Sequence, residues 1–455
     1  MNAVLNRVFR LEAAGTTVRI EVLAGLTTFL TMAYIIFLQP AILSVDFSGK
    51  PTGLDFGAVV LATCLASALA SVVMGLYARF PIALAPGMGE NYFFVTVVMT
   101  LAAAGIAEAW KVALGIVFVA GIIFLGLSLF GVRERIIEGI SPSMRHGIAG
   151  GIGLFIAFIG LRNGDVLVSK PGAWLGLNPH LGSPKVAVFA LGLAVAGILQ
   201  ARKIRGSILW GIAAAGVLAI LMGELRFEGQ GVGAVVGFPR IASPAALQLD
   251  IEGALTLFCL PFIIVFTLMA LLDATGTLVA VAQQAGITTK EGKTPRIVQA
   301  LVVDSGATVV GAALGTSTVT AYIESAAGVA YGGRTGLTAV VAGLLFLAAL
   351  CFGPLIHVIG GYPPLTAPAL VVVGVLMLQS ARHIEWDDFS EALPSFLVLA
   401  GIPLCYSIAD GLALGFISYP VVRVAAGKGR QVHWLMYVLA LALLAYLLTA
   451  RQRLS

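Results

Sequence analysis

The chain has 455 residues, of which 59% are hydrophobic and 11% charged, with a formal net charge of +5. Its mean hydropathy is +1.01. Soluble domains carry roughly 25% charged residues, so this composition excludes an ordinary soluble protein. The small basic excess does not indicate a nucleic-acid-binding surface, and the four cysteines lie in apolar surroundings without the paired spacing of disulfides or metal sites.

Uncharged apolar runs predict membrane-spanning helices along the first half of the chain. The segments 22–44, 57–78 and 112–131 contain no charged residue. Each approaches the ~20 residues that a helix needs to cross the hydrocarbon core. The expected elements of this half are 22–44, 57–78, 82–101, 112–131, 146–161, 185–200 and 206–222.

A more polar passage, 223–255, precedes a second series of apolar segments. The run 391–425 is long enough for two spans that fold back near Ser407–Gly411. We therefore expect an all-α polytopic membrane protein of about fourteen elements, or fifteen if the last run is counted. The expected elements of this half are 254–280, 297–313, 316–331, 335–358, 363–380, 391–425 and 431–450.

The distribution of Lys and Arg predicts the orientation of the chain. Up to residue 382, the N-terminus and alternate loops hold fifteen basic residues, whereas the opposite loops hold seven. Because cytoplasmic loops carry the excess of Lys and Arg, we expect the N-terminus in the cytoplasm.

The two series of segments resemble an internal repeat. The third element of the first series is broken by PGMGEN (86–91), and the third element of the second follows GTSTVT (315–320). Paired interruptions at matching positions indicate a transporter site built on inverted repeats. Seven spans per half would invert the second half. The predicted division is 1–222 for the first repeat, 223–253 for a connecting loop and 254–455 for the second repeat.

Five carboxylates lie inside the predicted spans: Glu90, Asp273, Asp304, Glu324 and Asp410. A charged side chain at mid-span costs roughly 2.5 kcal/mol or more, so each acid needs a cavity, a partner or a proton. An isolated acid of this kind can equally be a buried group that only fixes packing. For Asp304 and Asp410 we expect a structural or proton-relay role.

Glu90 and Glu324 differ from the others because both lie at the breaks. If the helices resume near Asn91 and Ala321, each restart exposes unpaired backbone N–H groups and a positive dipole end. Extended backbone at STVT is tolerated in a membrane only where it lines a cavity. The pattern predicts a pocket for a small molecule, with Glu324 as its strongest candidate ligand. Aromatic side chains beside the breaks could stack on a planar ring or simply pack.

Asp273, in LLDATGTL, ends an apolar run and precedes small residues. Together with Glu324 it could accept hydrogen bonds from ring N–H groups of a neutral heterocycle. It could also carry a coupled proton, because burial favours the protonated form of a carboxylate.

Three stretches resemble one family of membrane proteins: PGMGENYFF (86–94), LLDATGTL (271–278) and GTSTVTAYIESAAGVAYGGRTGLTA (315–339). They are similar to the azaguanine-type purine permeases, a branch of the nucleobase–cation symporters. The likeness extends from 21–37 to 406–419. It implies fourteen spans as two inverted sevens, with spans 1–4 and 8–11 forming a core domain and spans 5–7 and 12–14 a gate domain.

The resemblance also implies a substrate between the broken third and tenth spans, held by Asp273, Glu324 and Asn91. It implies a homodimer in the cytoplasmic membrane, driven by the proton gradient. Glu90 and Tyr92 stand where the family more often has leucine and alanine, which leaves the preferred purine open.

The expected function is proton-coupled import of hypoxanthine, guanine, adenine or xanthine, without a cofactor or metal and with Na⁺ left open as the coupling ion. The candidate proton-coupling residues are Glu324, Asp273, Glu90 and Asp304. The candidate substrate-binding residues are Glu324, Asp273, Asn91, Glu90, Tyr92, Phe93, Thr275, Ser317, Thr318 and Tyr322.

The alternatives are a uracil or anion transporter of the same architecture, an ion channel and a membrane enzyme. Acids at both breaks would repel an anion, and a basic residue at position 324 would have favoured one. The sequence shows no repeated filter motif of a channel and no nucleophile–base set of an enzyme. A transporter of neutral nucleobases is therefore the preferred reading.

Overall fold

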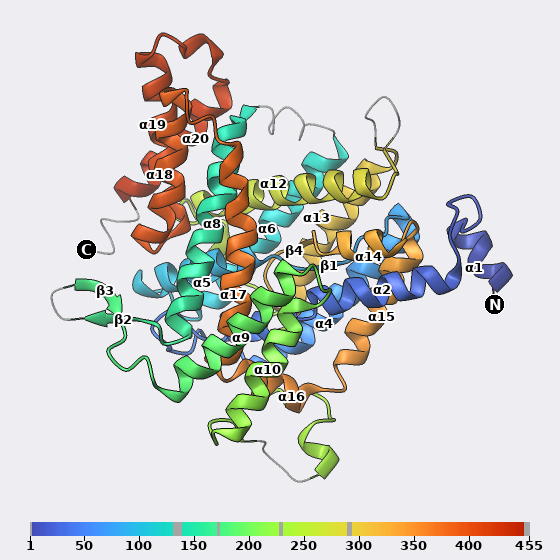
Figure 1. The fold of residues 1–455 in the computed structure, drawn as a ribbon. Coiled ribbons are helices and arrows are strands. Elements are labelled where there is room, and N and C mark those ends of the chain that lie inside the picture. The colour runs from blue at the N-terminus through green and yellow to red at the C-terminus, as the bar shows by residue number, and fades with distance from the viewer. Residues whose placement is uncertain (1, 131–138, 171–172, 227–230, 289–293, 450–455) are drawn as a thin grey trace.

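The computed structural model describes residues 2–130, 139–170, 173–226, 231–288 and 294–449. These residues form a predominantly helical protein (Figure 1). Nine helices among them are long and apolar enough to span a membrane. The predicted class, an all-α multi-pass membrane protein, is confirmed. The exact count of fourteen spans stays a prediction, and four of the basic residues counted for the orientation (Arg133, Arg135, Lys290 and Lys293) lie outside the described residues.

The first half of the chain contains nine labelled α-helices, a π-helical turn and three short strands. They are α1 (Asn2–Phe9), α2 (Val18–Met32), α3 (Ile35–Leu43), α4 (Phe56–Val73), η1 (Met74–Ala78), β1 (Leu84–Pro86), α5 (Met88–Ala103), α6 (Ala109–Leu129), α8 (Pro142–Asn163), β2 (Leu167–Lys170), β3 (Ala173–Leu177), α9 (Pro184–Ala201) and α10 (Ser207–Leu221).

The second half repeats much of this order after a short connecting region. Its elements are η2 (Gly231–Ala234), α11 (Ile251–Ala254), α12 (Leu260–Gln284), α13 (Ile297–Leu314), β4 (Val319–Ala321), α14 (Ser325–Tyr331), α15 (Gly336–Ala349), α16 (Gly353–Gly360), α17 (Pro363–Leu378), η3 (Gln379–His383), α18 (Phe389–Cys405), α19 (Ile408–Ala425), η4 (Gly429–Gln431) and α20 (Trp434–Thr449). In each half the third expected span consists of a short strand followed by a helix: β1 and α5 in the first half, β4 and α14 in the second. The domain boundaries inferred from this order stay a prediction.

The two broken spans meet through their strands. β1 and β4 form an antiparallel pair in which Ala85 lies opposite Thr320 (Figure 1). Because each strand is followed within a few residues by a helix, antiparallel pairing sends α5 and α14 away from the pair in opposite directions. This is the arrangement expected of inverted repeats.

The helices restart at other residues than the sequence predicts. α5 begins at Met88 rather than near Asn91, because Gly87 already acts as its N-cap. α14 begins at Ser325 rather than near Ala321, because Ala321 is still paired with Leu84 and a turn follows before the helix. Local sequence could not reveal this pairing between residues more than two hundred positions apart.

Three further features differ from the sequence-based expectation. The first span is interrupted at Ala33–Tyr34, between α2 and α3. The chain reversal predicted within 391–425 begins at Tyr406, whose backbone is left-handed with φ 55°. Ser407 then caps the following helix, α19. The hairpin of β2 and β3 had no predicted counterpart.

The helices pack as two neighbouring groups. α8 lies along α17, and α18 packs against α19 and α8 (Figure 1). On the other side, α2 and α4 pack against α15, and α13 packs against α4 and α6. The β1–β4 pair lies within the second group, so the broken spans face the α8–α17 pair across the molecule.

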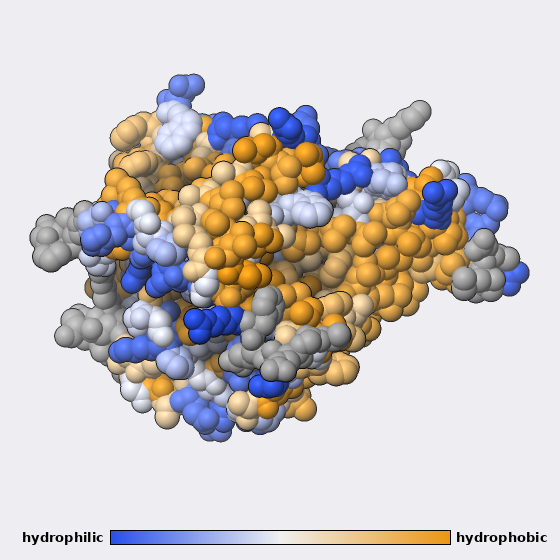
Figure 2. Space-filling model, turned by 60° about the horizontal axis from the view of Figure 1, so that its bottom comes forward, coloured by the Kyte–Doolittle hydropathy of each residue, from blue (hydrophilic) through white to orange (hydrophobic). Residues whose placement is uncertain are grey.

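Apolar side chains cover much of the outer surface. A broad region of hydrophobic residues extends across the face shown in Figure 2, with hydrophilic residues along its top and in its lower left part. Large exposed residues such as Leu69, Ile122, Leu221 and Leu441 lie on the apolar helices. Such a surface is stable against lipid and would associate in water.

The contact between η1 and α15 depends on two glycines, which gives a prediction about stability. A Cβ on Gly336 would lie 1.8 Å from the carbonyl oxygen of Gly75. Overpacking of this kind costs about 1–3 kcal/mol, so Gly336→Ala should lower the melting temperature in detergent, followed by fluorescence size-exclusion chromatography. Gly216→Ala in α10 is the control, because a Cβ there meets no atom within 4 Å. Equal melting of the two variants would contradict the predicted clash.

Candidate substrate-binding site

The β1–β4 pair satisfies the backbone polar groups at the two breaks. Beyond the paired residues, the Gly87 N–H donates to the Thr318 carbonyl at 3.0 Å, and the Tyr322 N–H donates to the Ala83 carbonyl at 3.0 Å. Within a membrane every backbone donor and acceptor must find a partner inside the protein. The ladder supplies those partners where neither chain is helical.

Side chains of neighbouring helices satisfy the outer edges of this ladder. Ser71 of α4 accepts the Leu84 N–H at 2.9 Å. Asp304 of α13 accepts the Ala321 N–H at 2.7 Å, and Thr308 of the same helix donates to the Val319 carbonyl at 3.0 Å. The two-stranded pair is therefore held on both edges by α4 and α13.

An amide network ties α3 and α5 to the chain leading into β4. The Asn91 side chain donates through Nδ2 to Oε1 of Gln39, and its Oδ1 accepts the hydroxyl of Ser317. Gln39 in turn donates through Nε2 to the Thr316 hydroxyl at 2.8 Å and to that of Ser317 at 3.1 Å. Since Gln39, Asn91 and Ser317 are all fully buried, the network stabilises the approach of the two breaks.

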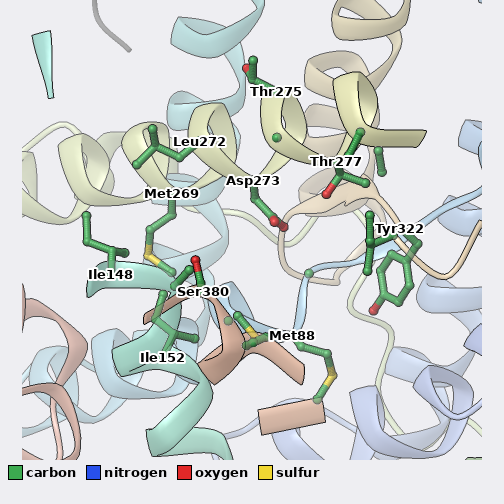
Figure 3. A pocket seen from close by; sticks show the side chains of 18 of the residues that line it. Met88, Ile148, Ile152, Met269, Leu272, Asp273, Thr275, Thr277, Tyr322 and Ser380 are labelled. Atoms are coloured by element: carbon green, nitrogen blue, oxygen red, sulfur yellow. The ribbon is translucent and has the colours of Figure 1, made fainter. Parts of the chain in front are cut away.

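A cavity of about 670 Å³ lies between the breaks and the α8–α17 pair. Figure 3 shows the Asp273 side chain pointing from α12 into the space between Ile152 of α8 and Tyr322. The broken spans and α12 supply most of its polar groups, while α8 and α17 supply an apolar wall. That wall consists of Ile148, Ala149, Ile152, Val373 and Met377.

Three carboxylates line this cavity: Glu90, Asp273 and Glu324. They come from three different elements and differ in exposure. Asp273 is exposed to the cavity, Glu324 is half-buried, and Glu90 is only 3% exposed. The Tyr34 hydroxyl donates to Oε1 of Glu324 at 2.6 Å. The arrangement presents several hydrogen-bond acceptors to a small molecule, with Arg145 and His146 of α8 as basic residues that also line the cavity.

The sequence and fold can now be compared with known proteins. A family model described as Permease family matches residues 19–414. The chain belongs to the Permease family. Adenine permease AdeP of Escherichia coli is 42% identical over 96% of this chain and 94% of its own. Guanine/hypoxanthine permease PbuG of Bacillus subtilis is also 42% identical, over 96% of this chain and 98% of its own.

A solved structure supports the fold assignment of this permease. The transmembrane domain of a cyanobacterium bicarbonate transporter, BicA, superposes with a TM-score of 0.60. The match covers 90% of this chain and 97% of that domain, at 17% sequence identity. At this identity the likeness establishes the architecture alone.

The permease brings five of the predicted site residues to the cavity: Glu90, Asp273, Thr275, Tyr322 and Glu324. Two of them have their hydroxyls already engaged. Thr275 donates back to the Leu271 carbonyl of its own helix at 2.7 Å, and Tyr322 donates to the Pro86 carbonyl at 2.5 Å. Neither hydroxyl proton is therefore free to bond a ligand, and the carboxylates are the charged acceptors of the cavity.

The other predicted residues are not among those that line the cavity. Asn91 and Ser317 belong to the amide network, and Thr318 is fully buried beside it. Phe93 packs against Phe266, with ring centroids 4.6 Å apart. Tyr92 packs in an aromatic cluster that is described below. A direct substrate contact by these five residues remains a prediction.

Sequence reasoning missed two residues of this region, Tyr34 and Gln39. Gln39 had a detectable signal, since an amide in an apolar span needs partners just as a carboxylate does. Tyr34 had none, because a tyrosine in a membrane helix is more often an interfacial or packing residue. The apolar lining residues of α8 and α17 carry no sequence signal of their own, because their role depends on tertiary packing.

The position of Asp304 predicts a structural role that substitution can test. Asp304 is fully buried and accepts the Ala321 N–H. Asp304→Asn keeps an oxygen acceptor, whereas Asp304→Leu leaves a buried N–H without a partner, which costs about 1–3 kcal/mol. We expect the melting temperature in detergent to fall clearly in Asp304→Leu and only slightly in Asp304→Asn. Equal losses for the two variants would show that the acceptor is not the stabilising feature.

Proposed function

We propose that this permease transports purine nucleobases across the cytoplasmic membrane, coupled to protons. The observation that carries the proposal is that Glu324 and Asp273, from separate elements, line one cavity large enough for a bicyclic ring. The names of two relatives, an adenine permease and a guanine/hypoxanthine permease, support a purine substrate.

In this proposal Glu324 and Asp273 accept hydrogen bonds from ring N–H groups of the purine. The apolar wall of α8 and α17 covers one face of the ring. Asn91 acts as a positioning residue, because both ends of its side-chain amide are already bonded to Gln39 and Ser317. A proton on one of the cavity carboxylates would travel with the purine, since an isolated charge in a low-dielectric site is costly.

The alternatives fit the cavity less well. An anion would meet Glu90, Asp273 and Glu324 at close quarters, and like charges in such a site repel. Uracil, a smaller neutral ring, could use the same acceptors, and competition experiments separate it from purines. The similarity to a bicarbonate transporter concerns the fold and therefore does not favour an anion here.

We further propose that the α8–α17 group is the gate and the group of the broken spans the core, which move relative to each other. The excess of basic residues in alternate loops supports an N-terminus in the cytoplasm. The motif resemblance supports a homodimer. Arg145 and His146, at the start of α8, then mark the cytoplasmic side of the cavity.

An aromatic cluster would close the cavity on its other side. Phe47 lies 5.0 Å from Tyr406, 6.0 Å from Phe155 and 6.2 Å from Tyr92, measured between ring centroids. Phe155 follows the cavity residue Ile152 by one helical turn on α8. The cluster joins α5 to α8 and to the α18–α19 junction. With the cavity lined by the start of α8, this arrangement corresponds to an inward-facing state.

The central test is transport by the purified protein in proteoliposomes. We expect uptake of labelled adenine, guanine or hypoxanthine driven by an inward-acid pH gradient, and competition by unlabelled purines.

The variant Glu324→Gln replaces the carboxylate with an amide that cannot ionise and has one acceptor oxygen instead of two. It should lower uptake by about tenfold or more while the protein still folds. The matched control is Glu224→Gln, outside the cavity. Uptake of sulfate or bicarbonate in place of purines would overturn the proposal, and normal uptake by Glu324→Gln would remove Glu324 from the mechanism.

The aromatic closure generates a second prediction. Phe47→Ala removes three ring contacts, each worth about 0.5–1.5 kcal/mol. We expect the steady-state accumulation of purine to fall by about tenfold, because substrate leaks outward, while the initial rate changes less. Phe389→Ala, an exposed ring outside the cluster, is the control. Unchanged accumulation in Phe47→Ala would show that the cluster is not a closure.

A further inference from the structure

The interruption of the first span brings a third element to the two breaks. Tyr34 lies between α2 and α3, where the Ile36 N–H donates to the Ala33 carbonyl at 3.1 Å and the Phe37 N–H to the Tyr34 carbonyl at 3.2 Å. These bonds skip two residues rather than three, so the helix tightens at this point. The Tyr34 side chain is 1% exposed and lines the cavity.

Two atoms of Glu324 are held by this interrupted span. Besides the Tyr34 hydroxyl on Oε1, the Thr31 hydroxyl donates to the Glu324 backbone carbonyl at 3.3 Å. Within the described part of the chain, no other side chain donates a hydrogen bond to the Glu324 carboxylate. One oxygen of Glu324 is therefore fixed by Tyr34, in a residue that lines the cavity.

We propose that Tyr34 is a positioning residue that sets both the direction and the proton affinity of Glu324. The inference rests on the proposed function, in which Glu324 binds the purine and takes part in proton coupling. A phenol donates one strong hydrogen bond and stays protonated at neutral pH. A bond from a neutral donor to an ionised oxygen is stronger than one to a neutral acid, so Tyr34 favours the carboxylate form of Glu324.

The hydrogen bond from Tyr34 to Glu324 has two consequences for transport. With Oε1 engaged by Tyr34, Oε2 is directed at the ligand, which lowers the cost of ordering the side chain on binding. The bond also lets Glu324 release its proton at a lower pH than it otherwise would. Tyr34 thus adjusts the pH range in which the loaded carrier can discharge on the cytoplasmic side.

Other ionisable groups face Glu324 and must be kept intact in any test. Asp273 of α12 and Glu90 of α5 line the same cavity, as do Arg145 and His146 of α8. Tyr322, directly after β4, lies beside the site but donates its hydroxyl to the Pro86 carbonyl. Asp304 of α13 lies behind the strand pair and accepts the Ala321 N–H. In the described residues, none of these groups donates a side-chain hydrogen bond to Glu324, whereas Tyr34 does.

The test is the pH dependence of purine uptake by Tyr34→Phe in proteoliposomes. Loss of a hydrogen bond to a charged group corresponds to a shift of about one to two pH units. We expect the fall of uptake with rising pH to move upward by that amount, and KM to rise more than kcat falls. The matched control is Tyr362→Phe, which deletes a tyrosine hydroxyl bonded to Glu224 at 3.1 Å, away from the cavity. It should leave the pH profile and KM unchanged.

A second variant and a second measurement keep the inference testable if Tyr34→Phe folds poorly. Fluorinated tyrosine at position 34 is a stronger donor of similar shape, and it should move the profile to lower pH. An infrared titration of the Glu324 carboxyl band, assigned by its loss in Glu324→Gln, should shift in the same directions without any need for transport.

The outcomes separate this inference from the proposed function. If Glu324→Gln abolishes purine uptake but Tyr34→Phe keeps the wild-type pH profile and KM, the role of Tyr34 is wrong and the proposed function stands. If no purine is transported, the proposed function fails, and the infrared titration still reports whether Tyr34 sets the proton affinity of Glu324. A titration that is identical in wild type and Tyr34→Phe would overturn the inference.

Discussion

The structure depends on one constraint: backbone that leaves the helical state inside an apolar region must have all its polar groups paired. The permease meets this constraint by pairing its two breaks with each other, as β1 and β4. Ser71, Asp304 and Thr308 satisfy the outer edges. Because each strand is the other's partner, neither break is stable alone, and the site exists only when both halves of the chain have come together.

The same pairing makes the site asymmetric despite the similar order of the halves. Glu90 lies in the first turn of α5, whereas Glu324 lies just before the short α14. One acid is therefore almost fully buried, and the other is half-buried and bonded to Tyr34. Asp273 adds a third, exposed acid from α12. Three acceptors in three environments can distinguish the edges of a flat heterocycle, which a symmetric pair of acids could not do.

The sequence predicted those features whose cause is local. Proline, glycine and β-branched residues indicated the two breaks. The cost of a charge in a membrane selected five carboxylates, of which Glu90, Asp273 and Glu324 line the cavity. The sequence could not show the helix starts at Met88 and Ser325, because these depend on a strand pair between distant segments. The family resemblance assigned Asn91 a substrate contact, which stays a prediction, and only the structure shows that its amide is bonded to Gln39 and Ser317. Tyr34 left no local trace, since its significance comes from a hydrogen bond across 290 positions.

The two walls of the cavity differ in a way that bears on movement. The wall formed by the broken spans and α12 carries the carboxylates and the strand pair, with their directional hydrogen bonds. The wall formed by α8 and α17 contributes Ile148, Ile152, Val373 and Met377. Its polar side chains there are Arg145 and His146, at the start of α8, and Ser380 in η3, directly after α17. Apolar contacts are non-directional, so sliding one wall along the other exchanges one set of packing contacts for another. Hydrogen bonds confined to one wall can therefore stay intact while access to the cavity changes.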